Sequence, residues 1–201
     1  MISQAIIKKY GRGEAVFIDE IECMFAQYKE AYIYRLLARE VASGEIVKFC
    51  RGVYYIPKKS IFGNVAISAE SVAQKCYITC GKDRFGIYGG LNLLNLFGVS
   101  TQLPYITDII TNKESSRCRE VKIGGSKFLL RKSRCEINNG NIREYALLEL
   151  LSVCSNEDLQ KAEVRRTVRE YAKDLNNRKL ASMSKYFPAR TSKRLIETGV
   201  V

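Results

Sequence analysis

A short apolar segment broken by one tight turn limits most strongly what this chain can fold into. Residues 45–50 (Glu-Ile-Val-Lys-Phe-Cys) read as a strand, Arg51-Gly52 as a turn, and residues 53–57 (Val-Tyr-Tyr-Ile-Pro) as a returning strand. Gly44, immediately before the first strand, is typical of the end of a helix. The segment therefore predicts a β-hairpin that directly follows a helix.

Three helices are predicted ahead of the hairpin. A first helix starts at a Ser3 cap and ends at Gly11, and a second begins at Asp19, after a short extended run over residues 16–18. The third covers residues 29–42, because apolar side chains recur on one of its faces. That inner stripe consists of Ile33, Leu36, Leu37 and Val41.

Helix, short strand, two helices and a hairpin is the order found in a winged helix-turn-helix, which predicts such a DNA-binding domain over residues 1–62. In that fold the amino-terminal half of the third helix enters the major groove, and the hairpin, or wing, contacts phosphates or the minor groove. The candidate DNA-binding residues are exposed side chains of these two elements: Tyr28, Lys29, Tyr32, Arg35, Arg39, Lys48 and Arg51.

The same module also serves as a protein–protein adaptor, so the pattern leaves other interpretations open. The basic residues of the third helix could form an ordinary solvated face, and Tyr32 and Tyr34 could belong to the core. Glu30 and Glu40 on the same helix argue mildly against a purely electrostatic contact. The formal net charge of +12, from 33 Lys and Arg against 21 Asp and Glu, favours a polyanionic partner.

Residues 63–201 are predicted to form a second, α+β domain with a small antiparallel sheet and C-terminal helices, after a linker over residues 57–63. Ser68 is placed to cap a helix, residues 106–111 read as a strand, and residues 118–131 as a hairpin that turns at Gly124-Gly125. The overall fold class is therefore α+β, with an N-terminal winged helix-turn-helix.

The last part of the chain is predicted to be helical. Residues 142–153 are apolar enough to be buried on nearly all sides, and a helix capped by Ser155 or Asn156 runs to about Leu175. Lys161, Arg165 and Arg169 recur every four residues on that helix and form a basic stripe. The stripe is interpreted as a solvated face with local ion pairs, or as a second phosphate contact or docking face for an acidic partner.

Segment 44–57 resembles the wing of AbiEi-type antitoxins, the winged-helix transcriptional autoregulators of type IV toxin–antitoxin (abortive infection) loci. The similarity lies in the glycine before the wing, the Arg-Gly-x-Tyr motif that begins at Arg51, and Pro57. It extends over roughly residues 1–155 and includes the corner at residues 101–104 (Thr-Gln-Leu-Pro). Residues 156–201 align with no motif of that family.

The resemblance implies a repressor of its own operon that binds an inverted repeat in promoter DNA, as a monomer or weak dimer. It also implies a functional partner, a nucleotidyltransferase-like toxin, that the second domain counters. The alternatives are a winged-helix regulator whose second domain senses a ligand or binds a protein, and a pure interaction module. Composition and periodicity lead only as far as DNA binding.

The sequence favours neither catalysis nor a metal. It has no histidine, and no carboxylate pair or Ser/Lys arrangement stands out, so we expect no enzymatic activity and no cofactor. Its seven cysteines contain no Cys-x-x-Cys pair and several lie among apolar residues, which is typical of reduced thiols in a cytoplasmic protein. Neither a secretory signal nor a run of about 18 apolar residues is found, so no membrane association is expected.

Overall fold

The computed structural model describes residues 1–61 and 63–200, and this part of the chain divides into two compact units. The first unit comprises Met1–Lys75 together with Ile123–Ser126, and the second comprises the remaining described residues. The domain boundary predicted at residue 62 falls on a residue that lies outside the described chain. The division by compactness comes after Lys75, so the segments on both sides of residue 62 belong to the first unit.

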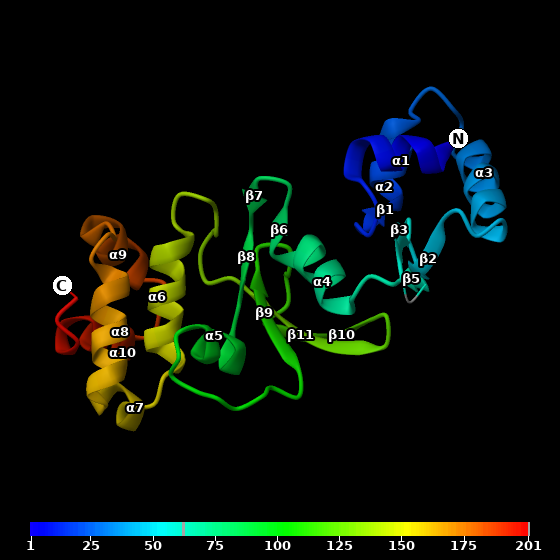
Figure 1. The fold of residues 1–201 in the computed structure, drawn as a ribbon. Helices are drawn as coiled ribbons and strands as arrows, with labels where there is room; N and C mark the ends of the chain where they lie inside the picture. The colour runs from blue at the N-terminus through cyan, green and yellow to red at the C-terminus, as the bar shows by residue number, and fades with distance from the viewer. Residues whose placement is uncertain (62, 201) are drawn as a thin grey trace. The chain divides into compact units, whose positions relative to one another are not determined.

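The first unit contains the predicted order of helices and strands. Its first six elements are α1 (Ile2–Tyr10), β1 (Val16–Phe17), α2 (Ile18–Met24), α3 (Glu30–Ala42), β2 (Val47–Cys50) and β3 (Val53–Tyr55). The three strands form one sheet of order β1-β3-β2, in which β3 runs antiparallel to both neighbours. Figure 1 shows these elements in dark blue to cyan.

One hydrophobic core joins the three helices to this sheet. Ile33 and Leu37 from the predicted inner stripe of α3 are each 2 % exposed, and they pack in one cluster with Ile6 of α1, Ile21 of α2 and Tyr54 of β3. Burial of an aliphatic side chain of this size stabilises a fold by about 1.5–3 kcal/mol, so this cluster fixes the orientation of α3.

The N-terminus of α1 is capped by a residue of α3. The Glu40 carboxylate accepts hydrogen bonds from the backbone N–H groups of Ile2 (2.8 Å) and Ser3 (2.7 Å). A carboxylate at this position satisfies two of the free N–H groups of the helix and complements its dipole. The predicted cap at Ser3 is therefore wrong: Ser3 lies inside α1, and its hydroxyl donates to Glu45.

The segment predicted to be a linker contains a second hairpin. Its strands are β4 (Lys58–Ser60) and β5 (Gly63–Val65), and α4 (Ala69–Tyr77) follows. The predicted cap at Ser68 is found, because its Oγ accepts from the N–H of Ser71 at 3.0 Å. Lys75 of α4 pairs with Glu20 at 2.7 Å and donates to the carbonyl of Ala15 at 2.6 Å, so α4 is held to the first unit.

The second unit contains a mixed sheet. Its strands are β8 (Gly86–Tyr88), β9 (Thr107–Thr111), β10 (Cys118–Ile123) and β11 (Ser126–Lys132), in the order β10-β11-β9-β8. The expected antiparallel pairing is found between β8 and β9, but β9 and β11 run parallel, so that part of the expectation is wrong. A short hairpin of β6 (Thr79–Cys80) and β7 (Asp83–Arg84) and the helix α5 (Gly90–Leu96) complete this part of the unit.

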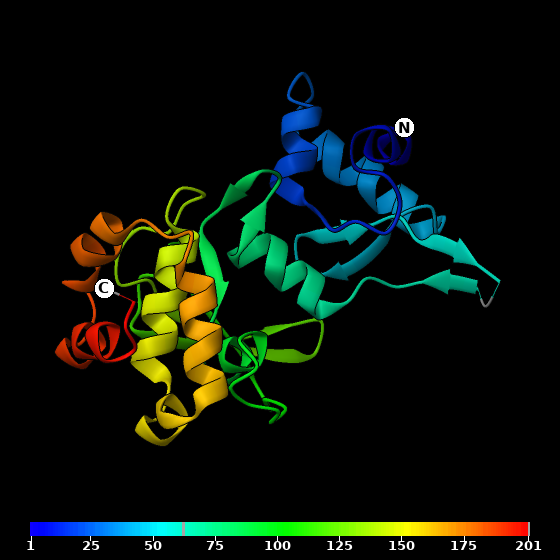
Figure 2. The same cartoon turned by 60° about the vertical axis from the view of Figure 1, so that its left-hand side comes forward.

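Five helices form the C-terminal half of the second unit: α6 (Ile142–Val153), α7 (Asn156–Gln160), α8 (Ala162–Ala172), α9 (Asn177–Ser184) and α10 (Ala189–Glu197). As predicted, α6 is buried on nearly all sides, and Figures 1 and 2 show it among the other helices. The predicted helix up to Leu175 is instead two helices, because Lys161 adopts an extended conformation between α7 and α8.

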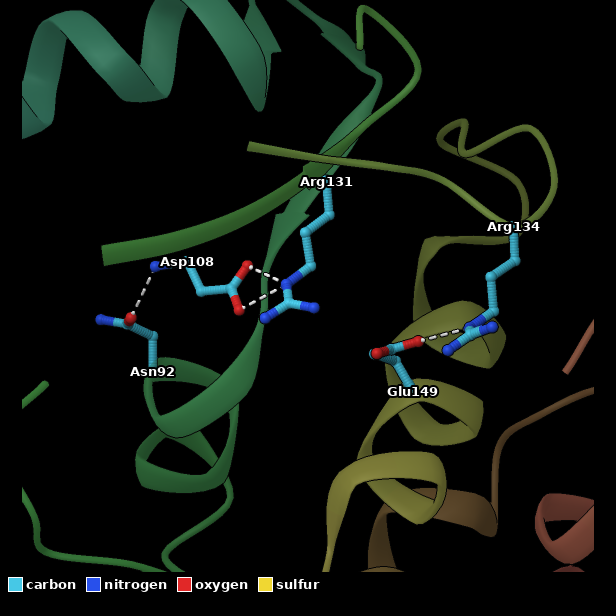
Figure 3. Close-up of polar contacts among 5 residues, drawn as sticks. All are labelled: Asn92, Asp108, Arg131, Arg134 and Glu149. Carbon is cyan, nitrogen blue, oxygen red and sulfur yellow. Dashed lines mark hydrogen bonds and ion pairs between the residues drawn. The ribbon is translucent and has the colours of Figure 1, made fainter. Parts of the chain in front are cut away.

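Two buried carboxylates of the second unit pair with arginines, one within the sheet and one on helix α6 (Figure 3). The carboxylate of Asp108 on β9 accepts hydrogen bonds from the Arg131 Nε at 2.8 and 3.0 Å. The backbone N–H of Asp108 donates to the side-chain oxygen of Asn92 on α5. The carboxylate of Glu149 on α6 accepts a hydrogen bond from the Arg134 Nε at 3.3 Å. Burial raises the pKa of both carboxyl groups, and the neighbouring arginines act in the opposite direction.

Candidate nucleic-acid interface

The structure places the seven candidate DNA-binding residues on the first unit, and every one of them is exposed. Tyr32, Arg35 and Arg39 lie on α3, and Lys29 is the residue immediately before the helix. Tyr28 lies in the turn that precedes α3, where its N–H donates to the carbonyl of Phe25. The remaining two lie on the β2–β3 hairpin: Lys48 within β2 and Arg51 at the turn.

Three of these residues stack on one another at the beginning of α3. The rings of Tyr28 and Tyr32 lie 5.2 Å apart between centroids, and the Arg35 guanidinium carbon lies 5.2 Å from the Tyr32 ring centroid. Such contacts between rings and a cation contribute about 0.5–1.5 kcal/mol each and restrict the side chains. The result is a preformed aromatic and cationic surface on an exposed helix face.

The alternative that Tyr32 and Tyr34 belong to the core does not hold. Their exposed fractions are 38 % and 47 %, which is far from the near-zero values of the core residues. Tyr34 is oriented towards α2, where a hydrogen bond with Glu22 raises the pKa of the Tyr34 hydroxyl. Tyr32, in contrast, is available for a partner.

The β2–β3 hairpin is shaped by a glycine and a bulge. Gly52 has a φ of +74°, a conformation that glycine adopts without strain, and its carbonyl accepts from the N–H of Ile18 at 2.9 Å. The pairing register shifts between Lys48 and Cys50, which twists the strand locally. Phe49, within this bulge, packs against Gly124 of the turn that also belongs to the first unit.

The basic side chains of α3 and the hairpin form no ion pairs within the described residues. Within residues 1–61 and 63–200, none of Lys29, Arg35, Arg39, Lys48 and Arg51 takes part in an ion pair. Of the two acids on α3, Glu40 is 5 % exposed and is held by the N-terminus of α1, so it does not face a partner. Only Glu30, in the first turn, remains exposed beside the basic residues.

The basic stripe predicted in the second unit is engaged locally. Lys161 pairs with Asp158 at 2.6 Å, the Arg165 Nε donates to the carbonyl of Leu159, and the Arg169 Nε donates to the carbonyl of Thr198. Lys161 of the stripe is therefore in an ion pair, whereas Arg165 and Arg169 are hydrogen-bonded to neutral carbonyl groups. The five basic residues of α3 and the hairpin, in contrast, take part in none of the ion pairs of the described chain.

Two further exposed basic residues of the first unit are not among the candidates predicted from the sequence. Lys58 and Lys59 are exposed on β4, and the aliphatic part of Lys58 lies against Gly13. The sequence predicts a linker here because these short strands contain few residues that favour β-structure. The one available signal was Gly63, which begins the returning strand with a φ of +105°.

Two other kinds of site are absent from residues 1–61 and 63–200. No group of three or more potential metal ligands occurs within the part of the chain that the structure describes. Within the same residues, no helix has the length and apolar character needed to cross a bilayer.

Comparison with known proteins places the chain in a family. None of the curated proteins matches it. The model of a family of unknown function, DUF6088, matches residues 2–177, which include all of the candidate DNA-binding residues. The chain therefore belongs to this family of unknown function, DUF6088.

Proposed function

We propose that this protein binds duplex DNA in a sequence-specific manner, with α3 in the major groove and the β2–β3 hairpin as the wing. The single observation that carries the proposal is the absence, among the residues that the structure describes, of ion pairs at five exposed basic residues on these two elements: Lys29, Arg35, Arg39, Lys48 and Arg51. Cations left free in this way are ready to replace the counterions of a phosphate backbone.

The arrangement of the first unit supports this interpretation. The order α1-β1-α2-α3-β2-β3 and the sheet order β1-β3-β2 agree with a winged helix-turn-helix, in which the third helix reads base edges. Because α3 buries Ile33 and Leu37, its opposite face, which carries Tyr32 and Arg35, is exposed.

Within this proposal the residues have different roles. Arg35, on the amino-terminal half of α3, is the candidate for a bidentate contact with guanine, and Tyr32 holds its guanidinium by stacking. Lys48 and Arg51 on the wing are candidates for phosphate or minor-groove contacts. Lys29 and Arg39 flank Arg35 and would add phosphate contacts along the groove.

Fluorescence anisotropy with the duplex upstream of the protein's own gene tests the proposal. The double variant Arg35→Ala, Arg51→Ala is expected to bind this duplex at least about thirtyfold more weakly, since each lost contact to a base or phosphate contributes roughly 1–3 kcal/mol. The control is Arg178→Ala on α9, which removes one exposed charge from the second unit and should leave binding unchanged within about twofold. If the double variant binds as tightly as the wild type, the interface is elsewhere, and a protein-docking role for the first unit becomes the better account.

We further propose that the protein acts as the antitoxin of a type IV toxin–antitoxin locus and represses its own operon. The support is the resemblance of segment 44–57 and of the corner at residues 101–104 to AbiEi-type antitoxins. The partner would be a nucleotidyltransferase-like toxin, countered through the second unit. The inverted repeat implied by the resemblance would bind two copies of the chain, which need not associate in its absence.

Co-expression tests the antitoxin role separately from DNA binding. The neighbouring reading frame is expected to stop growth when expressed alone and to be tolerated when the full chain is present. The Arg35→Ala, Arg51→Ala variant should still protect, because protection is assigned to the second unit. A harmless neighbouring product, or one without nucleotidyltransferase character, would contradict the antitoxin role and leave the DNA-binding proposal intact.

A further inference from the structure

The second unit contains a basic cavity that the proposed DNA interface does not use. It lies between α7 and α10, has a volume of about 340 Å³, and is also lined by the first turn of α8. This volume lies near the lower end of the range for small-molecule sites. Its charged lining residues are four cations and one carboxylate: Arg165, Arg190, Lys193, Arg194 and Glu197.

Arg194 is buried in this lining, and among residues 1–61 and 63–200 it has no acidic partner. Arg194 is 8 % exposed. One terminal nitrogen of its guanidinium donates to the Leu151 carbonyl and the other to the Asn156 side-chain oxygen, each at 2.6 Å, and both acceptors are neutral. Arg131 and Arg134 of the same unit, although more exposed, both face carboxylates. A buried guanidinium is costly unless it is paired and hydrogen-bonded, and Arg194 is bonded to neutral acceptors alone within the described residues.

The other cations of the cavity are also left without compensation. Arg165 donates only to the Leu159 carbonyl and the Gln160 side-chain oxygen, and Arg190 takes part in no ion pair within the described chain. The one carboxylate, that of Glu197, lies 3.6 Å from Lys193, and both side chains are largely exposed. The guanidinium groups of three arginines therefore line a concave site, and within the described residues none of them pairs with a carboxylate.

We propose that this cavity binds a phosphate monoester through Arg165, Arg190 and Arg194. A monoester phosphate carries up to two negative charges and three oxygens, which the planar donor sets of several arginines match in charge and geometry. The phosphodiester of a duplex carries one charge on the outside of a convex rod, and it does not fit a concave site of this size. The cavity and the DNA interface are assigned to different units, so this proposal does not rest on DNA binding.

Isothermal titration of the full chain with inorganic phosphate, at constant ionic strength, tests the proposal. The wild type is expected to bind one phosphate in a saturable manner. Arg165→Gln and Arg190→Gln should each weaken binding by about tenfold or more, because each removes a charged hydrogen bond. Arg166→Gln is the matched control: it removes the same charge from the adjacent, exposed position of α8, which does not line the cavity, and it should change binding by no more than about twofold.

Two results would overturn the proposal. One is the absence of saturable phosphate binding by the wild type. The other is a loss in Arg166→Gln as large as that in Arg165→Gln, because a diffuse positive field rather than a built site would then attract the anion. Arg194 is left unchanged in these variants, since its bonds to Leu151 and Asn156 also hold the helices together.

The source of the phosphate can be separated in the same assay. Single-stranded oligonucleotides with a 5′-phosphate or a 5′-hydroxyl are compared in the Arg35→Ala, Arg51→Ala background, so that the first unit contributes little. A preference of about tenfold or more for the 5′-phosphate, lost in Arg190→Gln, assigns a nucleic-acid end. Equal binding of the two oligonucleotides, together with specific binding of free phosphate, assigns a small phosphorylated molecule.

Discussion

The guanidinium carbon of Arg35 lies 5.2 Å from the ring centroid of Tyr32, one turn away on the exposed face of α3. The centroid of the Tyr28 ring lies 5.2 Å from that of the Tyr32 ring. Arg35 therefore has a preferred direction before any partner binds, which lowers the entropy lost when a contact is made.

Removal of the Tyr32 ring should weaken DNA binding. Tyr32→Ala is expected to reduce affinity for the upstream duplex by about two- to fivefold, in line with the roughly 0.5–1 kcal/mol of an exposed cation–π contact. Tyr32→Phe retains the ring and should bind within about twofold of the wild type in the same anisotropy assay. If Tyr32→Phe loses as much as Tyr32→Ala, the hydroxyl rather than the stacked ring makes the contact.

The cap that Glu40 provides for α1 should be a large contributor to the stability of the first unit. Glu40→Gln removes the buried charge that accepts from Ile2 and Ser3, and we expect the free energy of unfolding to fall by about 1–3 kcal/mol. Urea unfolding followed by circular dichroism measures this change. Glu30→Gln, on the exposed first turn of the same helix, is the control and should stay within about 0.5 kcal/mol. Equal effects of the two substitutions would contradict the capping role.

The two buried carboxylates of the second unit should give stability a specific pH dependence. Burial raises the pKa of Asp108 above 3.8 and that of Glu149 above 4.5, so the folded state takes up protons more readily than the unfolded state. The contribution of these groups is fully present below the unfolded-state values and is lost as pH rises through the folded-state values.

The double variant Asp108→Asn, Glu149→Gln lacks this dependence. Its thermal stability relative to the wild type should therefore improve as pH is raised from about 3.5 to about 7. Asp158→Asn should show the opposite trend, because hydrogen bonds from Lys161 and then Ser155 lower the pKa of Asp158. A relative stability of the double variant that does not change with pH would contradict the assignment.

The cysteines should differ sharply in reactivity. Cys23 and Cys118 are exposed, whereas Cys154 is 2 % exposed and burial raises the pKa of its thiol. Because the thiolate is the reactive form, N-ethylmaleimide should label Cys23 and Cys118 first and leave Cys154 unmodified until the chain unfolds. Peptide mass spectrometry over time measures the order, and early labelling of Cys154 would show that the helices around it open readily.

The elements that follow from local pattern were predicted well from sequence. The period of α3 identified Ile33 and Leu37 as buried, and Gly52 identified the turn between β2 and β3. Both signals lie within a few residues of what they determine. The exposed positions of Arg35 and Arg51 then follow from the geometry of the helix and the hairpin.

Features set by distant parts of the chain could not be predicted in this way. Glu40 caps α1 through the backbone N–H groups of Ile2 and Ser3, which lie 38 and 37 residues earlier in the sequence. No residue near Glu40 in the sequence indicates this capping role. The parallel pairing of β9 with β11 depends on which strand of the following hairpin lies beside β9, a choice that sequence order leaves open. Lys161 separates α7 from α8 where periodicity alone predicts one helix.

The basic cavity was missed for a related reason. In the sequence, the four-residue spacing places Arg165 in a basic stripe, and nothing connects that stripe with residues 190–194. The packing of α10 beside α7 brings Arg190 and Arg194 to the same cavity as Arg165. Arg194 could be recognised as unusual only once its burial was known.

The ratio of affinities for the upstream duplex and for a scrambled duplex of the same length and composition tests the central claim most directly. At about 0.15 M salt, DNA reading by α3 and the wing predicts that the upstream duplex binds at least about a thousandfold more tightly, as specific regulators do. A ratio within about tenfold would mean that the free cations of α3 and the hairpin attract phosphates without reading bases, and it would contradict the account.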